Sequence, residues 1–149
     1  MKRRSAASTP KPLEGWTLLC EESLGKKVPV ALRDNGLTVI IQGESPNIPR
    51  GVSDEELARL ASGKDWILIS KDLETRYRPN ERAAIVRAKL RVFQLTRGPW
   101  TSEEMIKALL AARMRMHRLV KKQAPPFIAR INKGGEFTTV FTEAELSGR

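Results

Sequence analysis

Residues 66–72 read W-I-L-I-S-K-D, and this stretch decides the fold class. Its apolar run is continuous and includes β-branched residues, which predicts a strand covered on both faces, as in a parallel sheet. Similar runs at residues 16–20, 37–42 and 91–95 predict three further strands.

Helical segments separate these strands. Ser23 can cap a helix that Asn35-Gly36 ends, although Pro29 confines its regular part to residues after about Lys27. The remaining elements are a helix opened by the Ser53/Glu56 capping box, a helix over 79–89, a long helix over 103–122 opened by Thr101/Glu104, and a hairpin over 127–141. This alternation predicts an α/β domain with a largely parallel sheet.

The chain has 149 residues, which fits one domain. Residues 1–13 are polar, basic and contain proline, so we interpret them as a flexible basic tail and residues 14–149 as a single domain. No apolar run approaches the roughly 20 residues of a membrane-spanning helix, and no apolar segment follows the basic start. We therefore expect a soluble, cytoplasmic protein without membrane contacts.

The scarcity of cysteine and histidine excludes several kinds of chemistry. Cys20 and His117 are the only residues of their types, so neither an intramolecular disulfide nor a Cys/His zinc site can form. His117 lies at the edge of the apolar stripe of the long helix, which favours a packed or solvated residue over a catalyst.

The charge of the chain is distributed unevenly. The net charge is +10, yet residues 1–75 hold 11 basic and 11 acidic side chains, whereas residues 76–149 hold 16 basic and 6 acidic ones. Residues 13–75 alone have a net charge of −4. Such asymmetry indicates a surface that binds a polyanion, with nucleic acid as the leading candidate.

Carboxylates follow the predicted strands at the edge where parallel strands bind ligands. Glu21, or its neighbour Glu22, follows the first strand, and Asp72 follows the strand at 66–70. Asp54 opens the second helix on its apolar face, because Leu57, Ala58 and Ala61 share its spacing. Each acid has a simpler interpretation: Glu21 as a helix cap, Asp54 as a first-turn residue and Asp72 as a turn acid.

Carboxylates held close together repel each other unless a cation lies between them, and an oxygen-only set suits Mg²⁺ or Mn²⁺. Such a metal activates water for attack on a phosphodiester. The basic second half of the chain begins beside Asp72 and can attract the phosphate backbone; its nearest members include Lys71, Arg76, Arg78 and Arg82. Together these features predict a metal-dependent nuclease.

The order of six short motifs also resembles the PIN-like family, and most closely its VapC-type toxins. The motifs are L-C-E-E-S-L-G (19–25), G-V-S-D-E-E-L (51–57), W-I-L-I-S-K-D (66–72), R-Y-R-P-N-E-R (76–82), R-V-F-Q-L-T (91–96) and P-P-F-I-A-R-I (125–131). The resemblance implies a three-layer α/β fold and a Mg²⁺- or Mn²⁺-dependent ribonuclease held inactive by a cognate antitoxin. It matches the metal-binding catalytic acids to Glu21, Asp54 and Asp72, and an orienting hydroxyl to Ser70.

The family usually has aspartate where this chain has Glu21, whose carboxylate lies about 1 Å farther from the backbone, and Mg²⁺ tolerates little displacement. Glu22 and Glu81 are further candidate ligands, although Glu81 can equally pair with Arg78 or Arg82. The alternative function is a weakened PIN-like module that binds RNA or a regulatory partner without cleaving it. A third interpretation makes the helix at 103–122, with its methionines, an interface for a homodimer or an antitoxin.

Overall fold

The computed structural model describes residues 11–44, 46–71 and 79–147. Its elements in chain order are β1 (Thr17–Cys20), a 3₁₀ helix η1 (Glu22–Leu24), α1 (Lys27–Asp34), β2 (Thr38–Ile41), α2 (Asp54–Ala61), β3 (Ile67–Ser70), α3 (Pro79–Ala88), β4 (Arg91–Leu95), α4 (Ser102–Lys122), β5 (Phe127–Ile131), β6 (Phe137–Phe141) and α5 (Glu143–Leu146).

The strands form one sheet in the order β2-β1-β3-β4-β5-β6. All neighbours are parallel except β5 and β6, which form an antiparallel hairpin. The predicted fold class, a mainly parallel α/β sheet with a long helix and a C-terminal hairpin, is therefore confirmed.

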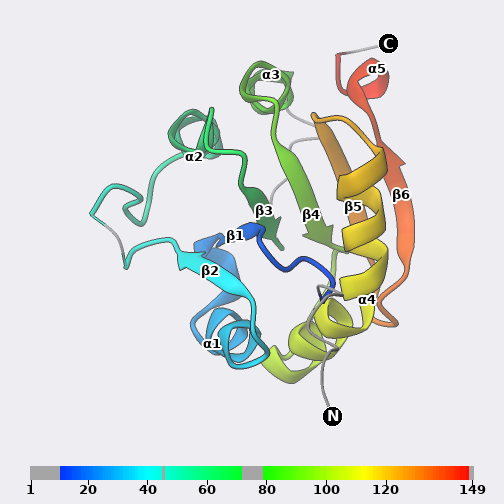
Figure 1. The fold of residues 1–149 in the computed structure, drawn as a ribbon. Helices are drawn as coiled ribbons and strands as arrows, with labels where there is room; N and C mark the ends of the chain where they lie inside the picture. The colour runs from blue at the N-terminus through cyan, green and yellow to red at the C-terminus, as the bar shows by residue number, and fades with distance from the viewer. Residues whose placement is uncertain (1–10, 45, 72–78, 148–149) are drawn as a thin grey trace.

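Two helical layers cover the sheet, one on each face (Figure 1). Alternate strand residues point to opposite faces, so Leu18 and Cys20 pack in a core with α1 and α4, whereas Leu19 packs in a second core with α2 and α3. The short helix α5 joins the second layer through Leu146, which is buried in the same core. These two cores make the three-layer arrangement.

The helix ends follow the capping signals of the sequence closely. Thr101 and Glu104 form both hydrogen bonds of a capping box at the start of α4. At α2 only half of the expected box forms: the Ser53 hydroxyl accepts from the Glu56 amide, but the Glu56 carboxylate pairs with Arg59 instead. The α1 helix begins at Lys27, and the expectation that Ser23 caps it is wrong, because Ser23 lies within η1 and Gly25, with φ of 75°, interrupts the chain before α1.

The segment before β1 lies against α4. The Leu13 amide donates to Nδ1 of His117 at 2.9 Å, and the guanidinium of Arg113 donates to the Pro12 carbonyl at 2.7 Å. Leu13 is only 1% exposed. Of the tail expected over residues 1–13, residues 1–10 lie outside the described part of the chain.

The methionines of α4 divide between core and surface. Met105 and Met116 are buried in the core between α4 and the sheet, whereas Met114 is 45% exposed. Two of the three methionines are therefore packing residues, and only Met114 is available to a partner. No helix among the described residues has the length and apolar character needed to cross a membrane.

Cys20 ends β1 and is fully buried. Burial raises the pKa of its thiol to about 12, and the charge of Arg33 opposes this shift only partly. We therefore expect iodoacetamide at pH 8 to label the native chain at least tenfold more slowly than the chain in denaturant, because the thiolate is the reactive form. Mass spectrometry of timed samples measures this ratio, and equal labelling rates would contradict the buried position.

Candidate functional site

The carboxyl ends of β1 and β3 lie side by side at the place where the strand order changes direction. From β1 the chain passes to β2 on one side, and from β2 it crosses to β3 on the other side. An open parallel sheet binds ligands at such a switch point, because the loops after the two strands diverge and leave room between them. The edge of the sheet at which the sequence predicts the site therefore contains the topological switch point.

Glu21 lies at this point. Cys20 pairs with Ile69 in the register, and the Glu21 amide donates to the Ile69 carbonyl at 3.0 Å, which extends β1 by one residue alongside Ser70. The half-buried Glu21 carboxylate accepts a hydrogen bond from the Ser23 hydroxyl. Glu21 and Ser70 are therefore neighbours on the adjacent strands β1 and β3.

Ser70 is fully buried, and its hydroxyl has no hydrogen-bond partner among the described residues. A buried hydroxyl without a partner costs about 1–3 kcal/mol, so native proteins rarely retain one without a reason. An oxygen atom at this position suits a divalent metal, which binds oxygen ligands, or its bound water, which can donate a hydrogen bond to the hydroxyl. The side chain therefore fits the orienting role that the resemblance implies.

The three polar side chains buried in the described part of the chain all lie toward this edge. Gln42 directly follows β2, Ser70 ends β3, and Gln94 pairs with Ser70 one residue before the end of β4. Sequence reasoning missed Gln42 and Gln94. The signal was present, since each is a polar residue that closes or follows an apolar strand.

Glu22 and Gln42 hold the loop between β2 and α2. The Gln42 side chain accepts from the Glu22 amide at 2.9 Å and donates to the Pro49 carbonyl at 3.0 Å. The Glu22 carboxylate accepts from the Gly51 amide at 2.8 Å. This set of contacts, which we call the loop clamp, gives Glu22 a structural task different from that of Glu21.

Asp54 is the first residue of α2 and is half-buried. Leu57, Ala58 and Ala61 are buried on the same side of the helix, as their spacing predicts. The loop clamp ends at Gly51, three residues before Asp54, and the Ser53 cap marks where this helix begins.

The remaining predicted site residues are placed as follows. Asp72, Arg76 and Arg78 lie outside the described residues, as does the side chain of Glu81. Lys71 is half-buried directly after Ser70, and Arg82 lines a groove of about 380 Å³ between α3 and α5. Among residues 11–44, 46–71 and 79–147, no three His, Cys, Asp or Glu side chains are grouped closely enough to hold a metal ion. The complete acidic set, which needs Asp72, stays a prediction.

Comparison with known proteins gives one family. A family model described as a PIN like domain matches residues 17–97, which run from β1 to just beyond β4 and make up more than half of the chain. No curated protein and no solved structure matches the chain.

Proposed function

The chain belongs to the PIN-like domain family, and on that premise we propose that it is a metal-dependent ribonuclease acting at the carboxyl edge of its sheet. PIN-like domains are generally nucleases and typically use divalent metals. The observation that carries the proposal is the buried hydroxyl of Ser70, which has no hydrogen-bond partner among the residues that the structure describes and lies beside Glu21 at the switch point. A purely structural sheet edge has no need of such a hydroxyl.

In this proposal Glu21, Asp54 and Asp72 hold Mg²⁺ or Mn²⁺, and Ser70 orients a ligand or water. When bound, such a metal lowers the pKa of a water molecule and offsets phosphate charge. The cations around β3 and α3 bring the substrate to the site by contacting its phosphates; they are Lys71, Arg76, Arg78 and Arg82. The loop clamp keeps the start of α2 in place.

We propose further that the chain is a cytoplasmic VapC-type toxin whose partner is a cognate antitoxin. The order of the six short motifs supports this narrower assignment. The exposed Met114 on α4 is available to an antitoxin or to a second copy of the chain. Measuring RNA cleavage in the presence of the protein encoded by the neighbouring reading frame tests whether that protein inhibits the chain.

The test combines cleavage with metal binding. We expect the purified chain to cleave single-stranded RNA when Mg²⁺ or Mn²⁺ is added but not in EDTA, and Mn²⁺ to raise its melting temperature by a few degrees, because a ligand that binds only the folded state stabilises it. Equal cleavage in EDTA would contradict the proposal. Binding of intact RNA without a Mn²⁺ shift would support the weakened, non-catalytic module instead.

A further inference from the structure

Four of the cations in the second half of the chain lie at the amino ends of the parallel strands, opposite the carboxyl edge that holds the candidate site. Arg87 and Lys89 stand where α3 ends and β4 is about to begin, and Lys121 and Lys122 stand where α4 ends before β5. All four side chains are exposed, and none forms an ion pair within the described part of the chain. Their charge therefore faces solvent away from the carboxyl edge.

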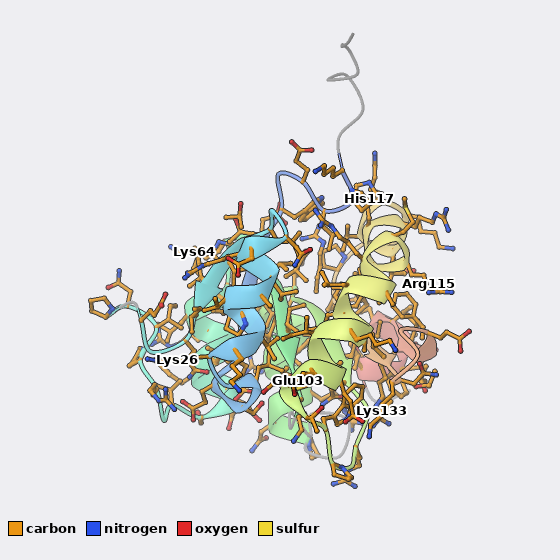
Figure 2. The ribbon with its side chains drawn as sticks, turned by 90° about the horizontal axis from the view of Figure 1, so that it is seen from below. Lys26, Lys64, Glu103, Arg115, His117 and Lys133 are labelled. Carbon is orange, nitrogen blue, oxygen red and sulfur yellow. The ribbon has the colours of Figure 1, made fainter. Side chains whose placement is uncertain are left out.

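Figure 2 shows the two ends of the molecule in one view. Lys64 and His117 lie toward one end, whereas Glu103 and Lys133 lie toward the other. Lys64 comes just before β3, and Glu103 lies in the first turn of α4 after β4, so the first end is the amino edge of the parallel strands and the second is the carboxyl edge. The sequence predicted that the basic half serves the acidic site, but these exposed cations lie at the amino edge.

A groove of about 470 Å³ opens at the amino edge. Trp66, Arg87, Lys89 and Pro125 line it, together with Asp65, and we call it the amino-edge groove. Its volume lies within the roughly 300–1,000 Å³ of small-ligand sites in proteins. It therefore has room for a base together with its sugar.

The groove combines aromatic and cationic groups, and its one acidic side chain is paired with an arginine. Trp66 is half-buried, and the Lys64 ammonium lies 6.0 Å from the centre of its ring. The single acid, Asp65, pairs with Arg91, whose guanidinium stacks over Trp16 at 4.8 Å. Arg87 and Lys89 therefore leave the groove with excess positive charge.

We propose that the amino-edge groove binds single-stranded nucleic acid, separately from the carboxyl-edge site. Proteins that bind single strands without reading their sequence combine a positive groove with aromatic side chains on which bases stack. Arg87 and Lys89 contact phosphates in this proposal, and Trp66 stacks a base. An acidic protein would also satisfy the cations, but a groove large enough for a base, with an indole in its wall, favours nucleic acid.

The ends of α2 and α3 supply a competing explanation for the cations. Helix carboxyl ends carry partial negative charge and favour nearby Lys or Arg. That role accounts for Arg87 and Lys89, and the packing of Trp66 against the second core accounts for its position, so this explanation requires no ligand. It also predicts that removing the cations changes stability and leaves nucleic-acid binding unchanged.

The experiment measures binding of a fluorescein-labelled oligouridine by anisotropy over a range of salt concentrations in EDTA. The test variants are Arg87→Ala/Lys89→Ala and Trp66→Leu. The matched control is Lys26→Ala/Lys27→Ala, which removes the same charge from exposed positions at the start of α1. Thermal melting of each variant verifies that it is folded.

We expect the double variant to bind about tenfold more weakly and to lower the slope of log affinity against log salt by about 1.4, the effect of two lost phosphate contacts on a single strand. Trp66→Leu is expected to weaken binding about tenfold with an unchanged slope, because it removes stacking but no charge. The control variant should bind like the parent.

Unchanged binding in both test variants would overturn the inference, as would an equal loss in the control pair. Binding of polyglutamate in place of oligouridine would assign the groove to an acidic protein and also overturn it. Because no metal is present, these results are independent of cleavage. A chain that binds through the groove but never cleaves RNA would refute the proposed function alone.

Discussion

Glu21→Gln is expected to lower RNA cleavage at least a hundredfold, whereas Glu22→Gln should stay within about threefold of the parent. The two residues are identical neighbours with different surroundings. Glu21 extends β1 at the switch point beside Ser70, and its loss removes a proposed metal ligand. The Glu22 carboxylate accepts from the Gly51 amide, a contact that a glutamine oxygen can replace.

Single-turnover cleavage of one RNA by both variants measures this difference, with Asp72→Asn as the reference for a lost catalytic acid. The melting temperature in Mn²⁺ gives a second reading: the metal-dependent rise should vanish in Glu21→Gln and persist in Glu22→Gln. A large loss in Glu22→Gln with little change in Glu21→Gln would move the metal to the second glutamate.

Gly135→Ala is expected to lower the free energy of unfolding by about 3 kcal/mol, which for a chain of this size corresponds to a melting temperature roughly 6–12 °C lower. A Cβ at this position would lie 2.7 Å from the Ala111 Cβ and 3.0 Å from the Ala108 carbonyl oxygen. The backbone there has φ of +80°, which adds a cost for any residue with a Cβ. The β5–β6 hairpin packs against α4 at a distance that only glycine allows.

Gly134→Ala is the matched control in the same turn. Its added Cβ would meet only the Asn132 side-chain oxygen, at 3.5 Å, and its φ lies outside the left-handed region. We expect a change within about 0.5 kcal/mol, measured by urea denaturation of both variants. Equal losses at the two positions would show that the turn itself, and not its contact with α4, determines stability.

The sequence predicts most elements of this fold because local signals place them. The run at 66–70, the capping box at Thr101 and the glycine at 36 each act through neighbouring residues, and the structure confirms the elements that they mark. The helix α5 escaped prediction because it spans only Glu143–Leu146, too short for a periodic pattern.

The candidate site is less predictable because it depends on contacts between distant segments. Spacing alone cannot distinguish Glu21 from Glu22, since the Gly51 amide that engages Glu22 lies 29 residues away. The same limit applies to the cations: their number follows from the sequence, but their position at the amino edge follows from where α3 and α4 end.

The loop clamp has a consequence for the energetics of binding. Its hydrogen bonds join Gln42 and Glu22 to Pro49 and Gly51, and the Gly43 amide adds another to the Ile48 carbonyl at 2.7 Å. The conformational entropy of the residues that these bonds hold is therefore lost when the chain folds and not when a ligand arrives. A preorganised loop leaves more of the interaction energy available for affinity, so this side of the site is assembled before anything binds.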